Sequence, residues 1–87
     1  MPRLGGDIEA MERLQSQLKQ RGQDIQRLRS EMTNMIQSTW WEGPAANNFK
    51  NEWNGQYSSS LQKLEALLAD LGQEVQRRKD ALIQVSQ

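Results

Sequence analysis

Apolar residues in the first half of the chain recur at steps of three and four positions. Such steps are typical of one face of an α-helix and of the a and d positions of a heptad repeat. Asp7 suits the N-cap of this helix, and Arg21 is the one residue that interrupts its apolar row. The pattern predicts a first helix over about residues 7–41, with a packing stripe made of Met11, Leu14, Leu18, Ile25, Leu28, Met32 and Met35.

The second half of the chain carries a similar stripe, which Arg78 interrupts. Phe49, Trp53 and Tyr57 step by four and lead into it, so the spacing runs through the rival turn signal Asn54-Gly55. We therefore predict one continuous second helix over about residues 44–84. Its packing stripe consists of Leu61, Leu64, Leu68, Leu71 and Val75, with Leu82 and Val85 beyond them.

A break in the chain is expected between the two stripes, at Gly43-Pro44. Glycine adopts the dihedral angles that end a helix, and proline suits the first position of the next one. A turn at about residues 42–43 lies near the middle of the chain and leaves two arms of similar length. Such arms fold back on each other. The sequence thus predicts an all-α fold, with residues 1–87 forming a single antiparallel helix-turn-helix hairpin.

The hairpin is expected to need a partner. Arms of this length are roughly 50–60 Å long at 1.5 Å per residue, and two such rods touch along one line and enclose no core. Further apolar residues also widen the stripes, as in the helices of a bundle. These residues are Ile8, Ile36, Trp40, Leu67 and Ile83. We expect two hairpins to dimerise into a four-helix bundle whose stability depends on protomer concentration.

The two arginines that interrupt the stripes admit two interpretations. With a turn near residue 43, Arg21 lies opposite about residue 65, so Arg21 is expected to pair with Glu65, and Arg78 with Asp7 or Glu9. Such pairs define the register of two helices more than they stabilise them. Alternatively, both guanidinium groups extend from the edge of the stripe into solvent.

Composition narrows the possible functions. The 87 residues are 36% hydrophobic and 25% charged, with eleven basic and eleven acidic residues, and the mean hydropathy is −0.87. No run approaches the roughly 18–20 apolar residues that span a membrane, and a neutral chain has no general attraction for nucleic acid. We therefore expect no membrane insertion and no nucleic-acid partner. The N-terminus also lacks a basic segment followed by an apolar one, so no cleavable signal peptide is expected.

Cysteine and histidine are both absent from the sequence. This removes thiolate and imidazole, the commonest metal ligands, and the commonest general base. Without histidine or cysteine, the chain lacks the side chains that commonly activate a nucleophile. It also has no Glu-x-x-His pair for a di-iron bundle. We expect no enzymatic activity, no catalytic residue, no cofactor and no metal site.

Tryptophan is concentrated around the predicted turn, in Trp40 and the tripeptide Trp41-Glu42-Gly43. An indole can cover the open end of a two-helix seam, and glycine allows a backbone geometry that a side chain would obstruct. Trp41 is thus expected either to pack the hairpin end or to contact a receptor. Trp40, Trp53 and Phe49 should lie at the same end, either as a local core or as an exposed recognition patch.

A Trp-x-Gly turn between two long helices, in a short chain without cysteine, resembles the small WxG proteins of ESX, or type VII, secretion systems. The resemblance to these early-secreted-antigen-like proteins covers about residues 7–85, although Trp53-Asn54-Gly55 is a second Trp-x-Gly in the same chain. It implies a hairpin that forms a homodimer, or a heterodimer with a sister WxG protein. The dimer would leave the cytoplasm folded, without a cleavable signal peptide, through a machinery that includes a membrane-bound FtsK/SpoIIIE-like ATPase.

The chain departs from the family pattern in its export signal. The family commonly carries Tyr-x-x-x-Asp/Glu after the second helix, but here Tyr57 lies inside that helix and Leu61 stands where the acid is required. Two explanations remain open. A paired protein carries the signal, or this chain uses an apolar C-terminal contact formed by Leu82, Ile83 and Val85, residues that also fit the bundle stripe.

The resemblance implies a secreted substrate or secretion factor that acts through protein–protein contact. Two other functions compete with it. Needle subunits of type III secretion are also helical hairpins of similar length without cysteine, although their turns are usually polar and bounded by proline. A coiled-coil adaptor that is never exported is the third interpretation.

Overall fold

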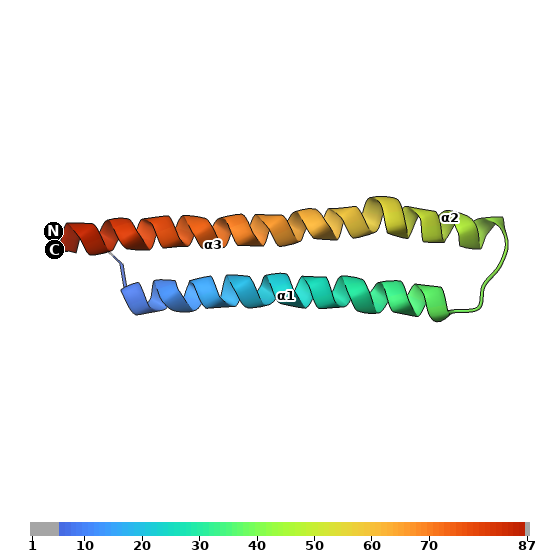
Figure 1. Ribbon diagram of the computed structural model, residues 1–87, viewed down its shortest axis with the longest axis horizontal. Helices are drawn as coiled ribbons and strands as arrows, with labels where there is room; N and C mark the ends of the chain where they lie inside the picture. The colour runs from blue at the N-terminus through green and yellow to red at the C-terminus, as the bar shows by residue number, and fades with distance from the viewer. Residues whose placement is uncertain (1–5, 87) are drawn as a thin grey trace.

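The computed structural model describes residues 6–86, and within this range the chain is an elongated helical hairpin with extents of 66 × 19 × 17 Å (Figure 1). One arm is helix α1, Ile8–Ser38. The other arm runs back beside it as helix α2, Pro44–Glu52, the π-helix η1, Trp53–Tyr57, and helix α3, Ser58–Ser86. The expected all-α hairpin is therefore confirmed, and its second arm contains a π-helical turn that the sequence did not predict.

Helix α1 begins at the expected N-cap and ends before the tryptophans. The Asp7 carboxylate accepts a hydrogen bond from the Ala10 amide at 3.1 Å, which satisfies one unpaired donor of the first turn. At the other end, the hydroxyl groups of Ser38 and Thr39 donate to the Met35 carbonyl at 3.2 and 2.7 Å. Thr39 is already extended. Because these hydroxyls compete for a helix carbonyl, the helix stops short of the predicted boundary at residue 41.

The corner of the hairpin depends on one glycine. Residues 39–43 cross between the arms, and Gly43 has φ 112° and ψ 175°, a region that residues with a Cβ strongly disfavour. Pro44 then opens α2, and the Gly43 carbonyl accepts from the Asn47 amide at 3.0 Å. Gly55, the glycine of the second Trp-x-Gly, lies inside η1 instead. The two tripeptides therefore have different structural roles.

The π-helix η1 contains the Asn54-Gly55 signal that could have made a turn. The Ser58 amide donates to the Trp53 carbonyl, five residues earlier, so this turn holds one residue more than an α-helical turn would. Such a bulge rotates the side chains that follow relative to those that precede it. Trp53 is buried and Tyr57 is exposed, so these two residues, which step by four in the sequence, do not share one environment.

The seam between the arms is thin and only half apolar. Along each arm the partly buried positions follow a heptad repeat, and large apolar residues occupy one of its two inward positions. These residues are Leu18, Ile25 and Met32 on α1 and Leu61, Leu68, Val75 and Leu82 on α3. Along the middle of the hairpin the other inward position holds polar residues or glycine, namely Gln15, Gly22 and Arg29 on α1 and Glu65, Gly72 and Lys79 on α3, whereas Ile8 and Ile36 occupy it at the two ends of α1. Among the described residues, only Ala46 and Trp53 are buried hydrophobic residues.

The expected packing stripe is in fact two rows. Leu18 and Leu68 lie in the seam, whereas Leu14 and Leu64 are exposed. Each arm contacts one neighbouring helix, so only one of two adjacent rows can face it. The second row stays at the surface of the hairpin, so the predicted stripe divides into a seam and an exposed row.

Candidate interaction surfaces

The hairpin corner presents aromatic side chains at one end of the molecule. Trp41 and Phe49 pack against each other with ring centroids 5.7 Å apart and planes tilted by 52°. Both remain exposed by 43%, and Trp40 is exposed by 84%. Tilted aromatic pairs of this geometry are favourable contacts. The corner is therefore partly packed and partly a surface that offers aromatic area to a partner.

Trp53 does not belong to this exposed group. Its indole Nε1 donates a hydrogen bond to the Thr33 hydroxyl at 2.9 Å, and the side chain is only 6% exposed. The Thr33 hydroxyl donates in turn to the Arg29 carbonyl at 2.9 Å. The aromatic residues expected to gather at the turn thus divide into the Trp41–Phe49 pair, the exposed Trp40 and the buried Trp53. Sequence reasoning missed Thr33, a polar residue on an apolar helix face.

Exposed apolar residues recur at heptad spacing on one side of the hairpin, in a row here called the outer row. In antiparallel helices, the positions just before the polar seam positions flank the same side of the seam. On α1 the outer row holds Leu14, Leu28 and Met35, and on η1 and α3 it holds Tyr57, Leu64, Leu71 and Val85. Leu67 is also exposed and lies one helical turn from Leu64 and Leu71.

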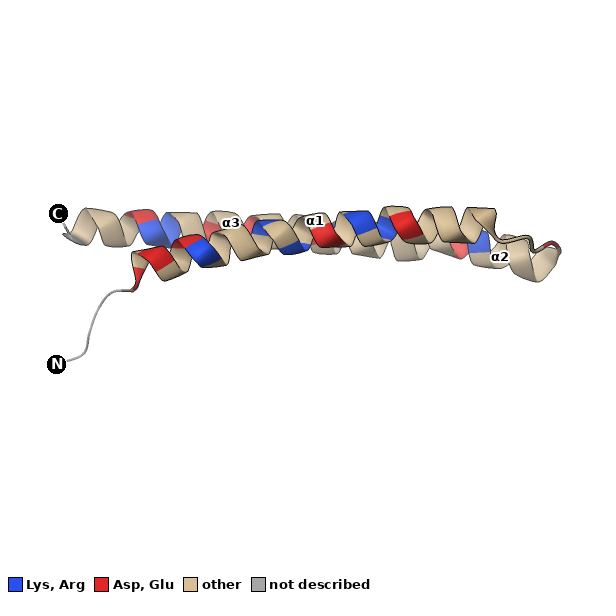
Figure 2. Cartoon of the chain, turned by 90° about the horizontal axis from the view of Figure 1, so that it is seen from below, with Lys and Arg blue, Asp and Glu red and all other residues tan. Residues whose placement is uncertain are grey.

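Two arginines occupy outer-row positions and form ion pairs within their own helices. Arg21 donates to the Asp24 carboxylate at 2.8 Å, and Arg78 donates to that of Glu74 at 2.7 Å. The pairs expected from the sequence, Arg21 with Glu65 and Arg78 with Asp7 or Glu9, are therefore not the ones formed. The reason is rotational: Arg21 and Arg78 lie beside the seam rather than in it, so acids on their own helix are nearer. Figure 2 shows acidic and basic residues interspersed along both arms.

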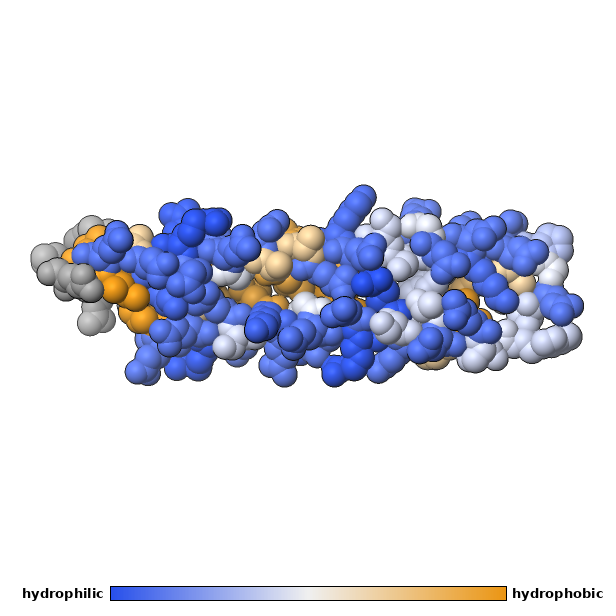
Figure 3. Space-filling view, viewed as in Figure 1, coloured by the Kyte–Doolittle hydropathy of each residue, from blue (hydrophilic) through white to orange (hydrophobic). Residues whose placement is uncertain are grey.

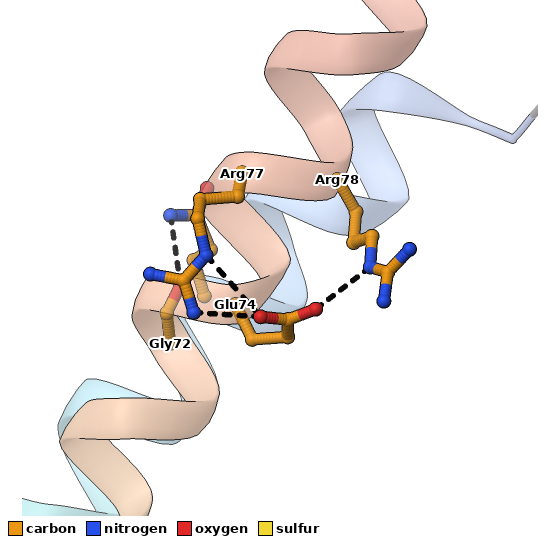
Figure 4. A network of polar contacts seen from close by, with 5 residues as sticks. Gly72, Glu74, Arg77 and Arg78 are labelled. Atoms are coloured by element: carbon orange, nitrogen blue, oxygen red, sulfur yellow. Dashed lines mark hydrogen bonds and ion pairs between the residues drawn. The ribbon is translucent and has the colours of Figure 1, made fainter.

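Glu74 is held between two guanidinium groups (Figure 4). Arg77 donates to one carboxylate oxygen at 2.6 and 3.2 Å, and Arg78 donates to the other at 2.7 Å. The hydrogen bonds from Arg77, followed by those from Arg78 and the attraction of both charges, lower the pKa of the Glu74 carboxyl. This cluster lies at the surface, and through it Arg78, which occupies an outer-row position, has an acidic partner.

Polar pairs cross the seam and define its register. Arg29 and Glu65 form an ion pair at 3.3 Å with side chains 23% and 19% exposed, and the Arg29 Nε is buried without a hydrogen-bond partner within residues 6–86. Lys79 lies 3.8 Å from Glu12. Partly buried pairs of this kind select one alignment of two helices more than they add stability. Glu65 was the expected acid, but its partner is the seam residue Arg29.

A groove of about 780 Å³ opens on the other side of the seam from the outer row. Its floor contains Leu18 and Leu68, with Gly22 and Gly72 on the two helices. The Gln15 amide spans it toward one end, donating to Gln76 at 2.7 Å and to the Gly72 carbonyl at 3.4 Å. Figure 3 shows a largely hydrophilic face with hydrophobic atoms between the helices.

The residues proposed for a C-terminal export contact do not share one environment. Leu82 and Ile83 are partly buried, whereas Val85 is 84% exposed at the end of the outer row. Of these three residues, only Val85 is therefore largely exposed to a partner in the single hairpin.

Within the described part of the chain, no helix is both long and apolar enough to span a membrane. Nor do residues 6–86 contain a group of three or more acidic side chains placed to hold a metal ion. Searches among family models, curated proteins and solved structures find nothing that matches this chain.

Proposed function

We propose that this hairpin works as a dimer in which two outer rows face each other and complete a four-helix bundle. The chain exposes 7057 Å² for a mass of 10.0 kDa, about 1,800 Å² more than a compact monomer of that size exposes. A standard protein–protein interface takes about 800 Å² from each partner. The excess surface is thus more than enough for one such interface.

The outer row suits a partner of its own kind. Its apolar residues follow a heptad spacing, which allows a second hairpin to interdigitate side chains with it. Asp24 and Glu74 already give Arg21 and Arg78 an acidic partner on their own helices, so neither arginine of the face depends on an acid from outside for an ion pair. A second copy of this chain satisfies these conditions, and so does a sister WxG protein with a similar face.

We further propose that this dimer is a substrate or secretion factor of a type VII (ESX) secretion system. The observation that carries the proposal is the corner: Trp41 packs against Phe49, and Gly43 adopts a glycine-specific conformation directly before Pro44. These are the positions of the Trp-x-Gly motif on which the family resemblance rests. The second Trp-x-Gly of the chain has its glycine within a helical segment and lacks this geometry.

In this proposal the folded dimer moves from the cytoplasm to the outside of the cell and acts through protein–protein contact. An FtsK/SpoIIIE-like ATPase is the proposed export partner. The aromatic corner and Val85, at opposite ends of the hairpin, are the surfaces available to it. Leu82 and Ile83 would contribute to such a contact only alongside Val85.

An export assay in the native host tests this function. The chain should accumulate in the culture medium of the parent strain and stay in the lysate of a strain without the secretion ATPase, while a cytosolic marker stays inside in both. Trp41→Ala should lower export at least tenfold, and Gln62→Ala, at an exposed polar residue of α3 outside the corner, should leave it unchanged.

Three results would contradict the proposal. Retention in the cytosol with an active export system would favour the adaptor. Release that is independent of the ATPase would exclude this route. Open-ended growth of purified protein with concentration would favour a filament subunit, because a symmetric dimer closes on itself.

A further inference from the structure

The groove opposite the outer row is bounded by polar contacts between the helices. The Gln15–Gln76 bridge crosses it toward one end, and Glu65, which pairs with Arg29, lines the other. Between them Gly22 and Gly72 place no side chain over the floor. The groove is therefore a defined trough in the middle of the hairpin, and a dimer formed through the outer rows leaves it open.

The fold of the hairpin does not require either glycine. Both have ordinary helical backbone, and a Cβ added at Gly22 or at Gly72 would meet nothing within 4 Å. Alanine is the better helix former at such positions. Glycine therefore weakens both helices without relieving any contact in the chain, and its effect is to let another backbone approach the groove floor closely.

The rim of the groove is made largely of uncharged amides. It carries five glutamines, and each primary amide offers both donors and an acceptor. Within the part of the chain that the structure describes, Gln23, Gln26 and Gln73 make no side-chain hydrogen bond. The rim is thus equipped to pair with neutral groups that also present donors and acceptors.

The acidic residues of the lining already have basic neighbours. Glu65 pairs with Arg29, and Glu12 lies 3.8 Å from Lys79, which leaves Lys19 as the remaining charged residue of the lining. An occupant with a large charge of either sign would find little to compensate it. The complementary ligand is therefore close to neutral.

An extended peptide fits this groove better than a helix does. The backbone groups of a helix are already paired internally, so a helix would need a broad apolar contact, and the rim residues are polar. An extended segment presents unpaired N–H and C=O groups that must find partners. The groove runs over residues 12–26 of α1, a length of about 21 Å, which corresponds to roughly six extended residues.

We propose that this groove binds an uncharged, extended peptide segment of a partner protein, with the glutamine rim pairing with its backbone and a small apolar side chain seated between Gly22 and Gly72. The site lies on the face away from the outer row, so it rests neither on dimerisation nor on export.

A titration of the isotope-labelled full chain, followed by NMR, tests the proposal. The probe is a blocked six-residue peptide of alternating threonine and valine. It should cause saturable shifts at the backbone amides of Gly22 and Gly72 and at the side-chain amides of Gln23, Gln26 and Gln73. A blocked helical peptide of alanine, leucine and glutamine serves as the competing probe and should bind at least tenfold more weakly.

Matched glycine variants make the test specific. Gly22→Leu and Gly72→Leu fill the trough and should weaken binding of the extended probe at least tenfold, while the melting temperature does not fall. Gly55→Ala, at a glycine that also has open space but lies outside the groove, should leave binding unchanged. Absence of saturable shifts, tighter binding of the helical probe, or full binding by both leucine variants would overturn the proposal.

Discussion

The Trp53 indole donates a hydrogen bond to the Thr33 hydroxyl at 2.9 Å and thereby ties η1 to α1. Trp53 is one of only two buried hydrophobic residues among residues 6–86. In a molecule that is otherwise a single seam, this contact is the nearest approach to a core. It lies beside the π-helical turn, so the one irregular segment of the second arm is also the one that is best anchored.

Trp53→Ala should lower the free energy of unfolding by roughly 3–5 kcal/mol, because it removes a large buried side chain and its hydrogen bond. Trp53→Phe keeps most of the apolar contact and should cost about 1 kcal/mol. Trp40→Ala is the matched control, since an indole exposed by 84% should change stability by less than about 0.5 kcal/mol. Urea unfolding followed by circular dichroism measures the stability of all three variants. Equal losses of stability for Trp40→Ala and Trp53→Ala would contradict the role of Trp53 as the buried anchor.

Gly43→Ala should destabilise the hairpin by about 1–3 kcal/mol through backbone strain alone. A Cβ at this position meets nothing within 4 Å, so no clash contributes to the loss. Gly22→Ala also places its Cβ in open space, but in ordinary helix, and should stabilise the protein by up to about 1 kcal/mol. Opposite signs in thermal unfolding are the expected result. A loss of similar size for both would show that the Gly43 conformation is not the cause.

Leu64→Asp should dissociate the proposed dimer, because it places a carboxylate in the middle of the apolar outer row. Gln62→Asp introduces the same charge on the same helix but outside that row, and should leave the assembly intact. Light scattering over a range of protein concentrations reads the mass of each variant. An unchanged mass for Leu64→Asp, or a wild-type protein that stays a folded monomer at every concentration, would contradict the proposed interface.

Glu65→Leu should lower stability by about 1–3 kcal/mol, because it leaves the partly buried Arg29 without its acid. Replacing both residues, as in Arg29→Met with Glu65→Leu, should restore stability to near the wild-type value, since an apolar pair avoids the desolvation of two charges. Chemical unfolding of the two single variants and the double variant forms a complete cycle. Additive losses would mean that the two side chains do not interact.

The ion pairs of Glu74 should make a small, acid-sensitive contribution to stability. Arg77 and Arg78 lower the pKa of Glu74 in the folded chain, so the contribution is present above the unfolded pKa and is lost as the pH falls through the folded value. Glu74→Gln should therefore melt earlier than wild type at neutral pH, and the difference should vanish well below the ordinary carboxyl pKa of about 4.3. Glu52→Gln, at an exposed residue with no ion pair within the described range, is the control. A difference that persists in acid would exclude the ionised carboxylate as the cause.

Local signals in the sequence were sufficient to predict the helices and the corner. Asp7 caps α1, and Gly43 and Pro44 separate the arms, because capping, positive φ and the missing proline N–H act within a few residues. The π-helical turn was not predictable in the same way. Asn54-Gly55 favours a break, yet the chain stays helical there, and the Trp53 indole at the start of this segment is anchored on α1.

The sequence by itself determined that two amphipathic helices meet at a glycine–proline corner, since each of those features depends on neighbouring residues alone. It did not determine which apolar row faces inward, because Leu14 and Leu18 belong to rows with the same spacing. Contacts between residues far apart in the chain decided that, above all Gln15 with Gln76 and Arg29 with Glu65. Those polar groups find each other in the rotation that the arms adopt, and that rotation leaves an apolar row on one side of the hairpin and an amide-rimmed groove on the other.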